Sequence, residues 1–493
     1  MQIPTQYPTA TDEDLEPANS FARANQTQTP LRWFWIALIC FLPLHVSAVV
    51  LDEWFILPPK PIGDGPDYEA IGYGLSQGHG WSTLRSDADW RSVYEDANDP
   101  KADLDYSAHL ARRGPITPDT NRPPLWPLCI AAVYKIVPRG PIAFGIIRIM
   151  LACCLSLGCA ISVAWGVALA KQLSRANGSI LATGMGVSLI AIVLSERNLR
   201  NYSTDFLTEP LALVLTQAFV VIAWYGVQKG SWQRAALTGA MFAGMYFCRG
   251  VFVLWVPMVI LWLCYAYRIT LPQVETCRLA SGRWVFVCML VFGLISSIWW
   301  VRNCYVLGSF HPLGTKGTTT LLGGYCDEAY RSGGEWQIAP EKELRRVLES
   351  KLDLDSASVA DRTDLELELG KQAAVQVKQW VRENLELIPS LFAKRAVTEW
   401  NPYWGKALLL KLSALVGVIW LAYNNRVALV WLTGPLIINT ILVVLTYSVG
   451  GRFLVPTYGL LYILSAFGFT GLLAMFSELR FYSVKRGSKR EPR

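Results

Sequence analysis

The chain is dominated by repeated runs of apolar residues that are long enough to cross a membrane. The composition is 52% hydrophobic and only 17% charged. The longer runs extend over roughly 18 to 25 residues, which matches the thickness of the hydrocarbon core of a bilayer. Because backbone polar groups in lipid must be hydrogen bonded within the segment itself, each run is expected to form a helix. The pattern predicts an all-α polytopic membrane protein.

We predict about 11 membrane-spanning helices, within a range of roughly 11 to 13. Two long polar segments, residues 52–121 and 302–403, interrupt the apolar pattern, and both are predicted to be outer loop regions. The second segment contains two helical patterns, residues 340–352 and 365–400. The membrane domain therefore covers residues 33–476. Its apolar runs cover residues 33–51, 125–137, 142–170, 180–194, 206–227, 235–248, 251–267, 284–300, 408–423, 427–449 and 453–476.

Charge placement orients the chain. Lysine and arginine gather in the tail, residues 477–493, and in short linkers between several runs. Because cytoplasmic segments carry an excess of these residues, the tail and the polar leader over residues 1–32 are predicted to be cytoplasmic, and both long polar segments extracytoplasmic. This topology accounts for the basic tail without a nucleic-acid partner. No basic region opens the chain, so the first run is predicted to be retained as a span.

The region from residue 125 to residue 194 leaves the topology open. Its basic linkers, at Arg139 and over residues 171–175, both favour the cytoplasmic side, although a single apolar run separates them. A break near Gly158 would divide the run over residues 142–170 and give twelve spans. The sequence alone does not settle the number of spans in this region.

The eleven cysteines form no metal-binding or redox pattern. Most lie in apolar runs, where cysteine is usually a small packing residue. Cys304 and Cys326 share an extramembrane segment, and a disulfide between them stays an open alternative. The chain contains no C-x-x-C, H-E-x-x-H or G-x-x-x-x-G-K motif, which argues against a soluble metalloenzyme or a nucleotide hydrolase.

Charged residues that interrupt the apolar pattern fall at the outer ends of the predicted helices. Carboxylates at a membrane boundary are costly and usually functional, and arginine matches phosphate with a planar, permanently charged group. A carboxylate beside a hydroxyl can act as a general base, so this set suits glycosyl transfer from a phosphate-linked lipid. For any single arginine, interfacial anchoring is the alternative. The set comprises Asp64, Asp67, Arg122, Glu209, Arg249, Arg302 and Arg452.

Several short motifs follow one another along the chain. Asp64 and Tyr68 precede LSQGHGW, and NRPPLWPLCIAAVYKIV enters the second apolar run. Later motifs are LTEPLALVL with Glu209, AGMYFCRG with Arg249, WWVRNCYVLGSFHPLG at the second outer loop, and GGRFLVPTYGLLY with Arg452. In this order they resemble the GT-C fold glycosyltransferases that use polyprenyl-phosphate sugars, including protein O-mannosyltransferases, the aminoarabinose transferase of lipid A and RgtA-like lipopolysaccharide transferases. The chain departs from that pattern in its longer, more acidic segment over residues 83–118 and in its two loop aspartates.

The resemblance implies an integral membrane glycosyltransferase of the cell membrane with an extracytoplasmic active site. Such an enzyme moves a sugar from a polyprenyl-phosphate donor to a hydroxyl of a glycan, lipid or protein, with inversion. The implied general base is Asp64, with Asp67 second. The implied phosphate-binding residues are Arg249 and Arg452, with Arg122 and Arg302 as alternates; Glu209 and Tyr68 would position the sugar or the acceptor, although Glu209 could equally form a structural ion pair.

The sequence also bears on metal ions and on function classes other than a glycosyltransferase. The histidines show no metal-ligand spacing, and a divalent cation beside Asp64 and Asp67 stays an open alternative. A transporter or flippase for lipid-linked sugars would show paired half-repeats and ionisable groups near the membrane midplane. The sequence shows no internal repeat, and its ionisable groups collect at the outer end, which favours an enzyme. A polymer ligase of the cell envelope that uses the same lipids is a further alternative.

Overall fold

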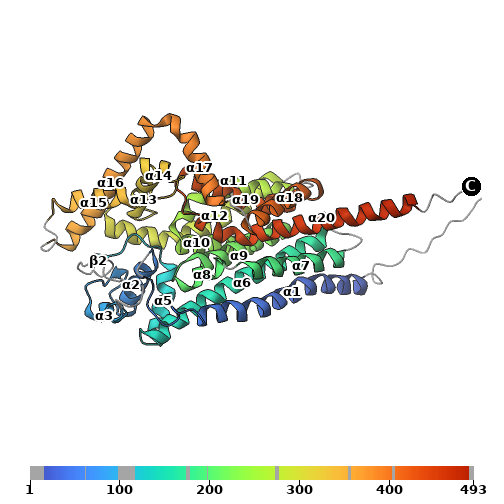
Figure 1. The fold of residues 1–493 in the computed structure, drawn as a ribbon, viewed down its shortest axis with the longest axis horizontal. Coiled ribbons are helices and arrows are strands. Elements are labelled where there is room, and N and C mark those ends of the chain that lie inside the picture. Colours follow the sequence, from blue (N-terminus) through green and yellow to red (C-terminus); the bar gives the residue numbers. More distant parts are fainter. Residues whose placement is uncertain are drawn as a thin grey trace, which may run out of the picture.

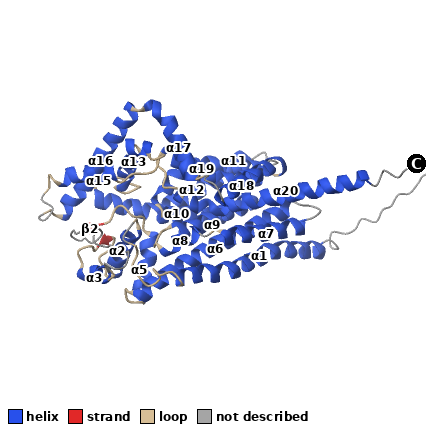
Figure 2. Cartoon of the chain, in the orientation of Figure 1, coloured by secondary structure: helices blue, strands red, loops and turns tan. Residues whose placement is uncertain are grey.

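The chain folds almost entirely into helices in a computed structural model that describes residues 16–60, 63–97, 117–173, 178–196, 198–271, 277–352, 357–401 and 406–487. Within these residues one antiparallel sheet pairs β1 (Ser82–Thr83) with β2 (Thr117–Pro118) (Figure 2). The prediction of an all-α polytopic architecture is confirmed. Most of the predicted insertion over residues 83–118, and parts of the predicted leader and tail, lie outside the described residues.

Eight helices in the described part of the chain are long and apolar enough to cross a membrane. They lie side by side in one elongated bundle (Figure 1). Their apolar surfaces suit contact with lipid and with neighbouring helices alike, so the bundle depends on close packing between the helices. The eight are α1 (Glu16–Val50), α6 (Pro141–Leu173), α9 (Glu209–Lys229), η2 with α11 (Gly250–Trp255 and Val256–Thr270), α12 (Cys277–Leu307), α18 (Lys406–Asn424), α19 (Arg426–Leu445) and η4 with α20 (Arg452–Thr457 and Tyr458–Gly487).

The number of long helices differs from the predicted 11 to 13 because three apolar runs form shorter helices. Of these, α7 (Gly178–Ser195) packs along α6 and α20, and α10 (Trp232–Cys248) packs along α9 and α12. Both lie within the bundle alongside the longer helices (Figure 1). The third, α5 (Leu125–Ile136), packs against α2 (Gly65–Ser76). Its twelve residues extend over only about 18 Å.

The structure resolves the topological conflict between residues 125 and 194. Helix α6 is unbroken from Pro141 to Leu173, so the break considered near Gly158 does not occur. The lack of a side chain at Gly158 instead lets α6 approach the side chain of Leu213 in α9. Arg139, which follows α5, donates from Nε to Oε1 of Glu69 in α2 at 2.6 Å. Helix α5 therefore begins and ends on the same side of the bundle, and Arg139 does not belong to the opposite side.

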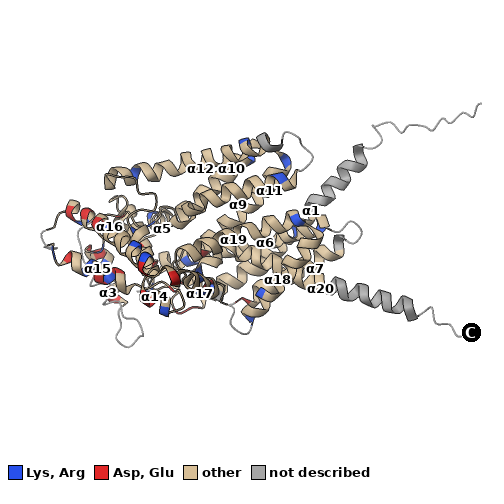
Figure 3. Ribbon diagram, turned by 90° about the horizontal axis from the view of Figure 1, so that it is seen from above, with Lys and Arg blue, Asp and Glu red and all other residues tan. Residues whose placement is uncertain are grey.

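Both long polar segments meet at one end of the bundle, which we call the loop end. The first segment contributes α2 and α3 (Ala88–Asp96), and charged residues are concentrated in α3 and in the helices of the second segment (Figure 3). The two segments touch through Thr120 and Thr315, whose Oγ1 atoms are 3.1 Å apart. The second segment contributes α13 (Lys316–Gly324), α14 (Asp327–Arg331), α15 (Ala339–Glu349), α16 (Val359–Glu383), η3 (Leu385–Leu387) and α17 (Ile388–Trp400).

The long helical pattern predicted over residues 365–400 divides into α16 and α17. The division follows Asn384, where the backbone leaves the helical region, and Pro389 lies in the first turn of α17. Proline is favourable there but disrupts a helix interior, because it cannot donate to the preceding turn. The bend turns α17 back toward the bundle, where it packs against α19. The pattern predicted over residues 340–352 matches α15.

A fully buried carboxylate anchors α2 at the loop end. Glu69 accepts hydrogen bonds from Trp90 Nε1 at 2.7 Å, Tyr94 Oη at 2.9 Å and Tyr134 Oη at 2.8 Å, besides the contact with Arg139. A buried carboxylate is stable only when its oxygens are satisfied in this way. Glu69 thus ties α2 to α3 and α5, and it holds the first turn of α2 at a fixed place over the bundle.

Candidate active site

The loop before α2 turns sharply to present Asp64. Gly63 adopts a left-handed conformation with φ of +73°, and Asp64 immediately precedes the first helical residue. Pro66 follows in the first turn, where the missing N–H has no helical partner to lose. A Cβ atom on Gly65 would lie 2.7 Å from the carbonyl oxygen of Asp205, so a larger residue would push α2 away from this loop. The sequence GDGP therefore sets the place of Asp64.

The two predicted aspartates share one guanidinium group. Arg122 Nη2 lies 2.7 Å from Oδ1 of Asp64 and 2.6 Å from Oδ2 of Asp67. Asp67 also pairs with Arg85, a residue of the same polar segment. The guanidinium carbon of Arg122 lies 5.2 Å from the ring centre of Tyr68, so the aromatic ring supports the cation from its face.

The turn that presents Arg122 is fixed by the carboxylate of Asp119, which belongs to none of the sequence motifs. Asp119 Oδ1 accepts the backbone N–H of Asn121 at 2.9 Å and that of Arg122 at 2.8 Å. An aspartate that binds the backbone two and three residues ahead is a common turn device. Burial raises the pKa of Asp119, although the hydrogen bond from Arg122 opposes the rise. The NRPP motif therefore enters α5 with its arginine directed at the two aspartates.

A second group of ion pairs joins the ends of three membrane helices. Glu209, the first residue of α9, is fully buried, and its Oε1 binds Arg249 Nη1 at 3.1 Å and also Arg452 Nε. Arg452 then reaches Asp64, with 3.0 Å between Nη2 and Oδ2. Arg249 ends α10, and Arg452 begins η4. A continuous chain of charges therefore connects α2 with the loop-end termini of α9, α10 and α20. We call these residues the charge cluster: Asp64, Asp67, Arg85, Arg122, Glu209, Arg249 and Arg452.

The arginines keep both aspartates ionised. Burial alone would raise the pKa of Asp64, but Arg122 and Arg452 outweigh it and hold the pKa well below its ordinary value. For Asp67 the same opposition holds, with Arg122 and Arg85 lowering the pKa. A carboxylate in this state carries its charge at neutral pH but has little affinity for a proton.

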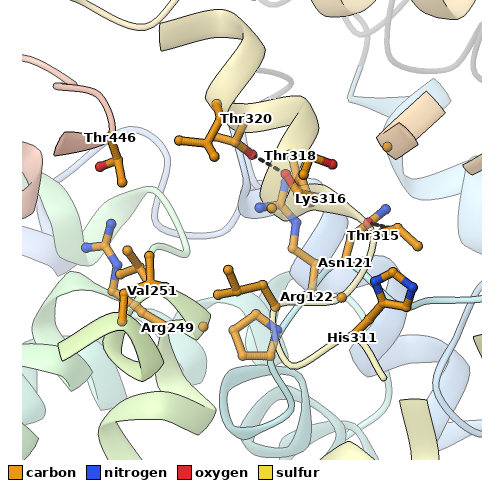
Figure 4. Close-up of a pocket in the computed structure, with 18 of the residues that line it drawn as sticks. Asn121, Arg122, Arg249, Val251, His311, Thr315, Lys316, Thr318, Thr320 and Thr446 are labelled. Carbon is orange, nitrogen blue, oxygen red and sulfur yellow. Dashed lines mark hydrogen bonds between the residues drawn. The ribbon is translucent and has the colours of Figure 1, made fainter. Parts of the chain in front are cut away.

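The charge cluster borders a cavity of about 760 Å³ at the loop end. Asp64 and three arginines of the cluster line it, whereas Asp67 and Glu209 lie behind its wall. Figure 4 shows Arg122 beside Lys316 at one side of the cavity and Arg249 at the other. Residues of both polar segments and of the bundle ends complete the lining, including Tyr68, Val251, Leu254, Thr315, Trp336, Glu366, Leu367, Tyr447 and Phe453.

Lys316 is a cation of the cavity wall that lacks a carboxylate partner. No Asp or Glu oxygen among the described residues lies within 4.0 Å of its amine, unlike the three cluster arginines. The nearby Arg122 is the main cause that lowers its pKa, followed by burial. Lys316 is also the first residue of α13, and the N-terminus of a helix carries partial positive charge. These features favour an anion in this part of the cavity.

Arg302 is the predicted site residue that the structure places apart from the others. Its Nη1 donates to the carbonyl of Asp119 at 2.6 Å and to Asn303 Oδ1 at 3.0 Å, and its Nη2 donates to the carbonyl of Trp81 at 3.1 Å. Arg302 does not line the cavity. Its guanidinium instead holds the first polar segment against α12. The other seven predicted residues, including Tyr68, meet in or directly beside the charge cluster.

Three residues of the site were missed at the level of sequence. Lys316 lies in the glycine- and threonine-rich stretch GTKGTTTLLGG, and a lone lysine among such residues is a usable signal for anion binding. Asp119 stands three residues before Arg122, a spacing that suits a turn. Arg85 lies in a segment rich in both charges and carries no distinguishing pattern, so only its contact with Asp67 reveals it.

The structure also bears on metal ions and disulfides. Within the described residues no group of three or more His, Cys, Asp or Glu side chains is arranged to hold a metal ion. Cys304 and Cys326 are both free thiols, so the disulfide considered between them is not formed. Cys326 instead caps the start of α14, where its Sγ accepts the N–H of Ala329 at 3.4 Å.

A comparison with protein-family models matches no family, and a search of curated proteins finds no match. The functional assignment therefore depends on the geometry of the cavity and the charge cluster, together with the order of the sequence motifs.

Proposed function

We propose that this protein is a membrane glycosyltransferase that transfers a sugar from a polyprenyl-phosphate donor to an acceptor hydroxyl at the extracytoplasmic face. The observation that carries the proposal is the position of Asp64. Its two oxygens bind Arg122 and Arg452, and it borders a cavity at the end of a membrane bundle. A carboxylate between two phosphate-binding groups suits a reaction in which a hydroxyl attacks and a phosphate leaves.

The cations of the cavity suit the phosphate of the donor. Arg122, Arg249 and Arg452 are already paired with carboxylates, whereas Lys316 has none within 4.0 Å among the described residues. Arginine binds phosphate through two parallel hydrogen bonds, and lysine supplies a compact charge. A phosphate bound here would satisfy Lys316 first and then compete with Asp64 for the two neighbouring guanidinium groups.

The apolar part of the cavity suits a lipid-linked sugar. Val251 and Leu254 come from η2, and Phe453 comes from η4, which are the loop-end segments of two spanning helices. A ligand in the cavity therefore contacts charged groups and the ends of the membrane bundle together. This arrangement supports a donor whose phosphate lies at the membrane boundary while its chain stays in lipid.

In the proposed reaction Asp64 accepts a proton from the acceptor hydroxyl. The acceptor oxygen forms a bond to the anomeric carbon as the bond from that carbon to the phosphate oxygen breaks, and the electron pair leaves with the lipid phosphate. Attack opposite the leaving group inverts the anomeric configuration. The phosphate competes for Arg122 and Arg452 and so weakens their ion pairs with Asp64. The pKa of Asp64 then rises at the stage when this carboxylate accepts the proton.

The direct test uses purified protein in liposomes with a polyprenyl-phosphate sugar and a mixture of hydroxyl acceptors. We expect release of lipid phosphate together with a glycosylated product of inverted configuration. Movement of the intact donor between leaflets without product would support a transporter and contradict the proposal. Polymerisation of donor-linked sugars among themselves would support a polymer ligase instead.

Loss of the unpaired cation should weaken donor binding. We expect Lys316→Met to raise the KM for the donor about 10- to 100-fold, because a hydrogen bond to a charged group contributes about 1.5–3 kcal/mol. The matched control is Lys371→Met, since Lys371 also lines the cavity but is exposed and lies 3.9 Å from Glu368. We expect about a twofold change at most for the control. Equal KM values for the two variants would remove Lys316 from the donor site.

The pH dependence of activity follows from the ionised state of Asp64. The arginines lower the pKa of Asp64 below the ordinary aspartate value of about 4. Asp64 therefore stays ionised in the free protein at every pH above that value. The value of kcat/KM reports groups of the free enzyme, so we expect no acidic decline between pH 5 and pH 8 from this residue. The measurement is kcat/KM for the donor over that range. A decline centred above pH 5 that disappears in Asp64→Asn would contradict the expectation.

A further inference from the structure

A further buried carboxylate outside the charge cluster also does not line the cavity. Glu399 belongs to the last turn of α17 and is 1% exposed. No lysine, arginine or histidine among the described residues lies within salt-bridge distance of it. Its oxygens are satisfied by hydrogen bonds alone. Oε2 accepts from Ser448 Oγ at 2.8 Å, Gly451 N at 3.3 Å and Val449 N at 3.4 Å, and Oε1 accepts from Leu454 N at 2.9 Å.

Three of the four donors, Ser448, Val449 and Gly451, belong to the turn that joins α19 to η4, and the fourth, Leu454, lies in η4 itself. Gly450 and Gly451 adopt left-handed conformations in this turn, with φ of +57° and +90°. Such a conformation strains residues with a side chain, so the glycine pair allows the turn. In this turn the N–H groups of Val449 and Gly451 both donate to Oε2 of Glu399, and converging backbone N–H groups of this kind bind anions. In this molecule the anion is the side chain of Glu399, supplied by the second polar segment.

The same turn carries Arg452 at its end. Arg452 is the residue that joins Asp64 to Glu209, and it comes from a part of the chain 388 residues away from Asp64. The turn is also held from another side, because Trp336 N donates to the carbonyl of Ser448 at 2.9 Å. Two separate parts of the second polar segment therefore fix the backbone from which the arginine extends.

We propose that Glu399 is a positioning residue that holds Arg452 in register with Asp64 and the donor phosphate. The inference rests on the proposed function, and it adds a role for the second polar segment. Groups that act on a reacting phosphate must stay within about 0.5 Å of their productive place. Arg452 directly follows two glycines, whose backbone has more conformational freedom than that of other residues. It meets the requirement only when the surroundings of these glycines fix their conformation. Hydrogen bonds to a charged acceptor are stronger than neutral ones, which suits a carboxylate for this task.

The competing interpretation is that Glu399 only stabilises the fold. The two interpretations differ in whether the effect of Glu399 depends on Arg452. If Glu399 acts through Arg452, its replacement should matter little once Arg452 no longer makes its native contacts. If it only stabilises the fold, its effect on activity should be the same with or without Arg452. A double-mutant cycle measures this dependence.

The first arm of the experiment measures kcat/KM for the polyprenyl-phosphate sugar in Glu399→Gln, Arg452→Lys and the double variant. We expect Glu399→Gln alone to reduce kcat/KM about 10- to 100-fold, as misplacement of a reacting group does. In the Arg452→Lys background we expect a further loss of about twofold at most. The same loss in both backgrounds, or no loss in either, overturns the proposal. The matched control is Glu335→Gln, since Glu335 is exposed beside Gly450 in the same region.

The second arm does not require transfer activity. It measures the coupling between Arg452→Lys and Asp64→Asn in the free energy of unfolding, with and without Glu399→Gln. We expect Glu399→Gln to reduce this coupling by more than half. An unchanged coupling overturns the positioning role whatever the activity. If the coupling falls but the wild-type protein transfers no sugar, the positioning role stands and the proposed function fails.

Discussion

The Asp64→Asn variant is expected to lose about 10²- to 10⁴-fold in kcat for sugar transfer, the range that removal of a general base produces. Asparagine keeps the shape of the side chain but cannot accept the proton of the acceptor hydroxyl. The side chain of Asp64 is 26% exposed and borders the cavity, so it is accessible to that hydroxyl. The measurement is single-turnover transfer from a polyprenyl-phosphate sugar, and full activity in a folded Asp64→Asn variant would rule out Asp64 as the base.

Asp67→Asn is the matched control for this prediction. Asp67 binds the same Nη2 atom of Arg122 and also pairs with Arg85, so both substitutions remove partly buried ion pairs near the start of α2. Asp67 does not line the cavity. We therefore expect a similar loss of thermal stability in both variants but at most about a tenfold loss of kcat in Asp67→Asn. Equal losses of kcat would mean that the ion pairs, not the base, determine the rate.

The Arg452→Lys variant is expected to lose about 10²- to 10³-fold in kcat, as enzymes do when one donor to a developing anion is removed. Lysine keeps the charge but has a single amine, so it cannot bind Glu209 and Asp64 through separate nitrogens as Arg452 does. The leaving phosphate would then lose a directed hydrogen bond in the transition state. Donor affinity should fall less than kcat, because part of the charge remains.

Arg345→Lys is the control for this substitution. Arg345 also makes a two-nitrogen ion pair, with Glu366 at 2.5 and 3.0 Å, but it joins α15 to α16 and is not part of the charge cluster. We expect its kcat to stay within about twofold of the wild-type value. The measurements are kcat and KM for the donor in all three proteins, checked for folding by size-exclusion chromatography. An Arg452→Lys variant with the kcat of Arg345→Lys would exclude Arg452 from the chemical step.

Apolar runs in the sequence do not by themselves give the number of membrane-spanning helices. The run that forms α5 has the composition of a spanning segment, and the basic Arg139 beside it predicted a cytoplasmic linker. In the structure α5 packs on α2, and Arg139 is neutralised by Glu69 at the loop end. A positive charge that is paired with a buried carboxylate no longer reports which side of the membrane it occupies. Hydropathy and charge counts contain no information on such pairing.

The structure brings together most of the residues that the sequence motifs singled out, and it adds residues from loops that no pattern indicates. Glu209, Arg249 and Arg452 meet because the loop ends of α9, α10 and η4 lie together, and Asp64, Asp67 and Arg122 join them from α2 and from the turn before α5. Arg302 also lies near a helix end, but its guanidinium binds backbone carbonyls instead of the cluster. Lys316 and Glu399 come from the second polar segment, whose path over the bundle is not encoded in any periodic pattern.

The sequence by itself determined the class of the protein and the kind of groups at its boundary. Long apolar runs must become helices in lipid, and the few charges that interrupt them must lie at their ends, because burial of an unpaired charge in hydrocarbon is too costly. Only the tertiary structure decided which charges pair. Asp64 was one of two neighbouring aspartates in the sequence, and it differs from Asp67 because it faces the cavity and binds Arg452. Contacts between residues hundreds of positions apart depend on how the helices pack, and local patterns do not record that packing.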